Sequence, residues 1–161
     1  MIRVSAALAA LAILASCASA PEPTATSSVS TGGWRFDYDA ATGVASAVQT
    51  QAGGGDTVAI TCRAPDGEMV IADYTLARAN AAQVDFAIRQ ESIRVPAARG
   101  TGPDGRPALT VRLPRRPPNL GAYPATDGTV RLTAGSATHT FASGAGEKIW
   151  QVAQACWPSG S

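Results

Sequence analysis

The fold is decided by residues 56–76, which read DTVAITCRAPDGEMVIADYTL. Over 58–62, large apolar side chains alternate with smaller or polar ones, which is the period of a strand with one buried face. Pro65-Asp66-Gly67 has the composition of a tight turn, and a second apolar run follows over 69–76. We therefore expect an antiparallel β-hairpin with one face directed toward a core.

The same alternation recurs on both sides of this hairpin. Short segments separated by close turns favour antiparallel pairing and leave no room for long helices between them. Pro96 is expected to stop the strand that contains Ile93 and Val95, because proline has no N–H to donate, and 99–107 is expected to be a loop. The chain is thus predicted to be mainly β, an antiparallel sandwich or barrel-like sheet of about eight short strands. Its strand segments are 34–38, 44–48, 58–62, 69–76, 84–88, 93–95, 109–113, 130–132 and 138–141.

One helix is expected near the end of the chain. Ser143 or Gly144 can cap it, and the acidic Glu147 is favourable near its positive N-terminus. Four apolar residues then recur at helical spacing, and Pro158 ends the helix. This stripe comprises Ile149, Val152, Ala153 and Cys156, and we expect it to pack on a core face that includes Trp34, Phe36, Val58, Ile60, Val84, Phe86, Ile88, Leu109, Val111, Val130 and Leu132.

Composition sets limits on size and partners. The chain has 161 residues and a formal net charge of +1, which suits one small domain. So balanced a charge gives no electrostatic basis for nucleic-acid binding, and aromatic residues, at 6% of the chain, supply few stacking platforms. We therefore expect no nucleic-acid partner.

The N-terminus reads MIRVSAALAALAILASC. Arg3 precedes an apolar run, Val4 to Ala15, that is shorter than the roughly 20 residues of a membrane-spanning helix and fits a secretory signal peptide. Leu14-Ala15-Ser16-Cys17 resembles the lipobox of bacterial lipoproteins, an aliphatic residue and two small residues before a cysteine. The competing interpretation is ordinary cleavage after Ala18-Ser19-Ala20, although Pro21, with no N–H and a fixed φ, is a poor residue after a scissile bond.

The resemblance implies that Cys17 receives a diacylglycerol, that cleavage falls before it, and that acyl chains hold the protein on a lipid bilayer. Residues 1–16 would be the signal peptide and 17–33 the lipidated cysteine with a flexible tether of small and polar residues. Residues 34–161 would form one globular β-rich domain. Ala18 follows the cysteine where this family uses aspartate for inner-membrane retention, so the inner leaflet of the outer membrane, facing the periplasm, is expected.

The remaining cysteines, Cys62 and Cys156, form an even pair once Cys17 is assigned to lipid. In an exported domain such a pair indicates a disulfide. Two buried free thiols are the alternative. A zinc site is disfavoured because neither cysteine belongs to a closely spaced pair.

Residues with catalytic chemistry are sparse. The one histidine, His139, lies between threonines on a predicted strand, where a surface position is expected. A deep pocket that held it beside an acidic residue would instead favour an enzyme. We expect no catalytic residue, metal ligand or cofactor, and a non-enzymatic binding or structural module of the cell envelope. The alternative is a periplasmic inhibitor of a hydrolase such as lysozyme, by analogy of size, export and disulfide.

The most suggestive segment is the proline-rich loop 114–127. Loops of this length are uncommon in compact domains and are often functional. This loop carries Arg115, Arg116 and Tyr123, and arginine and tyrosine are frequent anchors in protein interfaces. We expect these three residues to contact an envelope protein.

Overall fold

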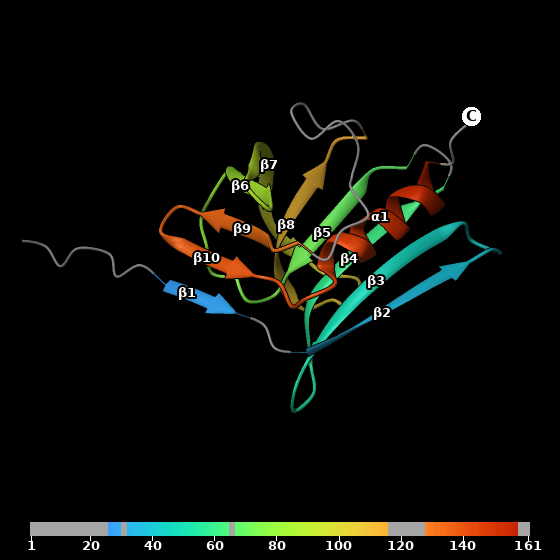
Figure 1. Cartoon of the computed structure of the whole chain (residues 1–161), viewed down its shortest axis with the longest axis horizontal. Coiled ribbons are helices and arrows are strands. Elements are labelled where there is room, and N and C mark those ends of the chain that lie inside the picture. The colour runs from blue at the N-terminus through green and yellow to red at the C-terminus, as the bar shows by residue number, and fades with distance from the viewer. Residues whose placement is uncertain (1–25, 30–31, 65–66, 116–127, 158–161) are drawn as a thin grey trace, which may run out of the picture.

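The structure, a computed structural model, describes residues 26–29, 32–64, 67–115 and 128–157 (Figure 1). Within these ranges the chain forms strands over most of its length and one helix at its end, so the mainly β prediction is confirmed. The elements are β1 (Thr26–Val29), β2 (Gly32–Asp39), β3 (Val44–Gln51), β4 (Asp56–Arg63), β5 (Met69–Asp73), β6 (Gln83–Ile88), β7 (Glu91–Thr101), β8 (Pro107–Leu113), β9 (Val130–Ala134), β10 (Ala137–Thr140) and α1 (Ala145–Cys156).

The strands form one curled sheet in the order β1-β10-β9-β6-β7-β8-β5-β4-β3-β2. Neighbours are antiparallel except for β1 and β10, which run parallel. The two edge strands, β1 and β2, are consecutive in the chain, so the Cα atoms of Val29 and Gly32 lie at most about 11 Å apart. The two edges of the sheet therefore approach each other at one end, which gives the half-barrel seen in Figure 1.

Strand β7 belongs to both halves of the sheet. It pairs with β6 up to Gln83 opposite Pro96, and with β8 from Ala97 opposite Val111 onward. The expectation that Pro96 stops this strand is therefore wrong, and the expected loop 99–107 begins only after Thr101. Proline is tolerated in a strand where regular pairing is interrupted, and Pro96 lies where β7 exchanges one neighbour for the other.

The core lies between the sheet and α1, which packs on β2, β3, β4 and β5. The predicted helix stripe is buried. Of the two predicted caps, Gly144 rather than Ser143 occupies the cap position, with a φ of 86°, a backbone conformation that favours glycine. Trp34 and Phe36 of the predicted core are half-buried and pack against it. The other predicted core residues are buried, namely Val58, Ile60, Val84, Phe86, Ile88, Leu109, Val111, Val130 and Leu132.

A disulfide joins Cys62 on β4 to Cys156 at the end of α1, with 5.9 Å between their Cα atoms. The predicted pairing is confirmed. Beside it, the indole Nε1 of Trp157 donates a hydrogen bond to the carbonyl oxygen of Gly67 at 2.9 Å. The end of the helix is thus attached both to a strand and to the turn that follows that strand.

Strand pairing begins before Trp34. Residues 26–29 and 32–33 fall in the segment predicted to be a tether, yet they form β1 and the start of β2. The edge of β10 presents backbone donors and acceptors, and β1 pairs with them through its own backbone, from Thr26 opposite Ala137 to Val29 opposite Thr140. The predicted signal peptide, Cys17 and the rest of the tether lie outside the described residues.

Candidate functional site

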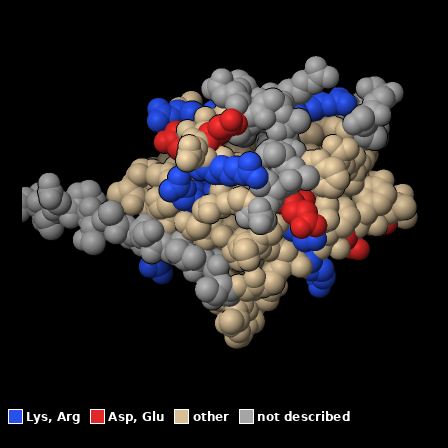
Figure 2. Space-filling view, in the orientation of Figure 1, with Lys and Arg blue, Asp and Glu red and all other residues tan. Residues whose placement is uncertain are grey.

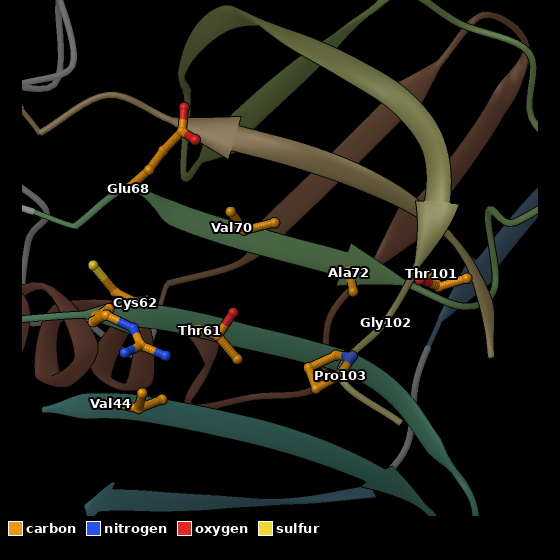
Figure 3. A pocket seen from close by; sticks show the side chains of 10 residues that line it. Val44, Thr61, Cys62, Glu68, Val70, Ala72, Thr101, Gly102 and Pro103 are labelled. Carbon is orange, nitrogen blue, oxygen red and sulfur yellow. The ribbon is translucent and has the colours of Figure 1, made fainter. Parts of the chain in front are cut away.

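A groove of about 450 Å³ opens on the outer face of the sheet, on the side away from α1 (Figure 3). Its floor crosses three adjacent strands and carries small or β-branched side chains. Val44 comes from β3, Thr61 from β4, and Val70 and Ala72 from β5. Because the floor consists of short side chains, an extended ligand could approach the sheet closely.

One wall of the groove is the tip of the β7–β8 hairpin, including Thr101, Gly102 and Pro103. Gly102 packs against Tyr74 so closely that a Cβ added to it would lie 2.1 Å from the phenolic oxygen. A larger residue at 102 would therefore displace the Tyr74 ring or the hairpin tip. The close approach places the hairpin tip over the outer face, and the groove owes this wall to it.

A polar cluster fixes the hairpin tip in this position. The hydroxyl of Tyr74 donates to the carboxylate of Asp104 at 2.9 Å, and the guanidinium of Arg106 lies 4.1 Å from the centre of the Tyr74 ring. Arg106 also pairs with Asp104 and donates to the backbone carbonyl of Asp56 at 3.2 Å. The cluster joins the hairpin to the end of β5 and the start of β4.

The cluster shifts the ionisation of its members. Burial, followed by the hydrogen bond to Asp104, raises the pKa of Tyr74 to about 12. Desolvation raises the pKa of Asp104, but hydrogen bonds from Arg106 and Tyr74 outweigh it and lower that pKa below its ordinary value. The bond to Asp104 raises the pKa of Arg106. At neutral pH the cluster is a phenol held between a carboxylate and a guanidinium.

The other end of the groove is charged. Glu68 lines it and pairs with Arg112 of β8. Arg63 also lines it, is exposed, and makes no ion pair with another described residue. Among the described side chains at this end, these three sum to one net positive charge. A ligand with a carboxylate or another anionic group would suit it.

The predicted contact loop starts beside this charged end. Leu113, the last residue of β8, pairs with Met69 of β5, next to Glu68. Arg115 is exposed just beyond that strand. Arg116 and Tyr123 lie outside the described residues. On the face shown in Figure 2, acidic and basic side chains are interspersed.

His139 is fully buried, so the expected surface position is wrong. Its Nδ1 lies 2.7 Å from Oδ2 of Asp73, which is also fully buried at the end of β5. Oδ1 of Asp73 accepts hydrogen bonds from the N–H of Thr75 at 2.9 Å, from the Thr75 hydroxyl at 2.7 Å and from the N–H of Leu76 at 3.0 Å. Asp73 thus ends β5 earlier than the predicted 69–76.

The Asp73–His139 pair resembles part of a catalytic arrangement in composition only. Both side chains have no exposed area, and neither lines the groove. Their contacts connect the end of β5 to β10 across the core. The pair therefore acts as a structural link between the two halves of the sheet.

A second polar link joins β2 and β3 to the segment after β10. The side-chain oxygen of Gln49 accepts a hydrogen bond from the N–H of Ala142 at 3.0 Å, and its amide donates to Thr57 at 2.8 Å. Nε1 of Trp34 donates to the carbonyl oxygen of Ala142 at 3.3 Å. Side chains thus satisfy backbone groups here that strand pairing does not.

Within the described ranges no group of three or more His, Cys, Asp or Glu side chains is arranged to hold a metal ion. In the same ranges no helical segment is long and apolar enough to cross a membrane. Comparisons with protein-family models, with curated proteins and with solved structures find no match to this chain.

Proposed function

We propose that this protein is a bacterial lipoprotein of the cell envelope, anchored through acylated Cys17, whose β-rich domain faces the periplasm and binds another envelope component. The lipobox-like stretch Leu14-Ala15-Ser16-Cys17 supports the anchor. The observation that carries the proposal is the Cys62–Cys156 disulfide. Disulfides persist in oxidising compartments such as the periplasm, and this one uses both other cysteines of the chain.

The anchor is tested by replacing the lipidated residue. Cys17→Ser is expected to abolish incorporation of a labelled fatty acid and to release the protein from membranes. Ser19→Ala, two residues away, is the matched control and should leave both unchanged. Mature wild-type protein that begins at Pro21 and carries no fatty chain would refute the proposal.

The β1 strand limits how far the domain can lie from the lipid. Because Thr26 already pairs with Ala137, nine residue steps separate Cys17 from the sheet. An extended chain of that length spans about 30 Å at most. In an anchored protein the edge formed by β1 and β10 would therefore remain near the membrane surface.

We assign the binding of the envelope component to the groove together with the base of loop 114–127. The groove supplies a floor of short side chains, and its charged end adjoins the start of the loop at Arg115. Tyrosine and arginine side chains are frequent binding anchors in protein interfaces.

This assignment is tested with two variants. Replacement of Arg115, Arg116 and Tyr123 by Ala tests the loop, and Thr61→Arg fills the groove floor. Pull-downs from envelope extracts with wild type and each variant should lose the same partner in both cases. Partners that are unchanged in both variants would refute the assignment. An inhibition assay with lysozyme distinguishes a hydrolase inhibitor from a binding module.

A further inference from the structure

Strand β2 is an open edge of the sheet. It ends the strand order and pairs only with β3 among the described strands (Figure 1). Its eight residues, Gly32–Asp39, present one row of backbone donors and acceptors away from β3. An exposed edge of this length is a template for pairing with another strand.

The sequence of β2 is complementary to itself. Two copies aligned antiparallel, with Phe36 opposite Phe36, place Arg35 of each copy opposite Asp37 of the other. The same alignment places Trp34 of each copy opposite Tyr38 of the other. The symmetric pairing thus contains two Arg–Asp pairs and two aromatic pairs, both of which stabilise antiparallel strands.

Of the groups that this alignment would pair, the two charged side chains have no ionic partner among the described residues, whereas Trp34 already packs against Phe141, with 6.2 Å between the ring centres. Arg35 and Asp37 are exposed, and neither makes an ion pair with another described residue. Asp39 differs, because its carboxylate accepts hydrogen bonds from the N–H groups of Ala41 and Thr42. Tyr38 is 45% exposed, and no other large hydrophobic residue in the described ranges is comparably exposed.

This fold already contains the same kind of cross-strand pair. Asp85 on β6 lies directly opposite Arg94 on β7, and the two side chains form an ion pair at 3.0 Å. An Arg–Asp pair at opposing positions is therefore compatible with the local twist of antiparallel strands. On β3, the one described strand beside β2, the uncharged Val48 and Ser46 lie opposite Arg35 and Asp37.

We propose that β2 is a self-association edge, through which two copies of this chain pair antiparallel about Phe36 and extend one sheet across both. Recognition rests on Arg35 opposite Asp37 in each direction and on Trp34 opposite Tyr38. The proposal does not depend on the lipid anchor. Charges on an edge strand can also protect it from pairing. Reversal of single charges distinguishes charges that promote pairing of β2 from charges that prevent it.

The test measures association of the full chain in mild detergent, with micelles in excess over chains, by sedimentation equilibrium. Arg35→Asp and Asp37→Arg each turn two attractions into two repulsions, so each is expected to weaken self-association at least about tenfold. An equimolar mixture of the two variants restores opposite charges at every pair. Native mass spectrometry of that mixture should show mainly the mixed dimer.

Asp85→Arg and Arg94→Asp are matched controls, because they make the same charge changes away from β2 and should not alter association. Circular dichroism checks that all variants are folded. Formation of the mixed dimer shows independently that the two β2 variants are folded. A wild type that stays monomeric up to about 1 mM would overturn the proposal. So would controls that weaken association equally, or a mixture that forms no mixed dimer.

Discussion

Replacement of Asp73 should destabilise the domain more than replacement of any exposed carboxylate. Its fully buried carboxylate accepts three hydrogen bonds from Thr75 and Leu76 and contacts Nδ1 of His139. Asp73→Ala removes every one of these acceptors at once. The turn after β5 and the link to β10 are then both affected.

The size of the effect follows from the groups left without Asp73. The Leu76 N–H and His139 Nδ1 are buried, and each donor left unsatisfied costs about 1–3 kcal/mol. The part-buried groups of Thr75 add about 1 kcal/mol. We expect Asp73→Ala to lower the free energy of unfolding by about 3–7 kcal/mol, a large share of the 5–15 kcal/mol typical of a small domain.

Asp73→Asn separates the turn from the link to His139. The amide retains one oxygen for Thr75 and Leu76 but turns an N–H₂ donor toward His139. The histidine must then accept at Nδ1, and the charge-assisted bond is lost. We expect a cost of about 1.5–3 kcal/mol, between wild type and Asp73→Ala.

Guanidinium unfolding with the disulfide intact measures these differences. Asp85→Ala is the control, because the side chains of Asp85 and its partner Arg94 are 47% and 67% exposed and their ion pair should contribute less than about 1 kcal/mol. A double-mutant cycle of Asp73→Asn with His139→Gln should show a coupling of at least about 1 kcal/mol. If Asp73→Ala costs no more than Asp85→Ala, the buried link does not hold the two halves of the sheet together.

Three further measurements test the disulfide, the polar cluster and the groove wall. Cys62→Ser with Cys156→Ser opens a loop of sequence separation 94 and should cost about 4–5 kcal/mol in the chain-entropy model, seen as a lower melting temperature; an unchanged melting temperature would contradict this. Absorbance at alkaline pH should show one tyrosine titrating near its pKa of about 12, and Tyr74→Phe should remove it. Because the neutral phenol is favoured in the folded state, this stabilisation is complete below pH 10 and is lost as pH rises through about 12; a stability that does not change over this range would contradict it. Gly102→Ala should displace the hairpin, cost about 1–3 kcal/mol and lower the pKa of Tyr74 toward 10.0. Gly33→Ala is the control, because no atom lies within 4 Å of the added Cβ, and it should leave the pKa of Tyr74 unchanged.

Most of the sheet could be predicted because burial repeats every second residue along a strand. At 58–62 and 84–88 the large apolar side chains point into the core, and the alternation marks them without knowledge of their partners. The helix stripe and the cysteine pair were found in the same way, from spacing and number. The strand alternation and the helix stripe are local in sequence, and the disulfide involves the two cysteines that remain once Cys17 is assigned to lipid.

The parts that could not be predicted depend on contacts distant in sequence. His139 lies between two threonines and reads as a surface residue, but Asp73, its partner, is 66 positions away. Pro96 was predicted to end its strand, but β7 exchanges its neighbour β6 for β8 at this residue and continues. That exchange depends on how the whole sheet is arranged and leaves no local pattern in the sequence. Polar residues such as Gln49 give no pattern when their partner is the backbone of Ala142.

The groove did leave a trace in the sequence, in the residues that alternate with the core. The outward positions of strands are usually polar when that face meets water. Here Ala59 on β4, Ala72 on β5 and Ala108 on β8 are outward yet buried, with Val48 and Tyr74 packed against them. Small apolar residues at several adjacent outward positions indicate a second covered face. The β7–β8 hairpin covers part of it, and the groove is the part that the hairpin does not reach.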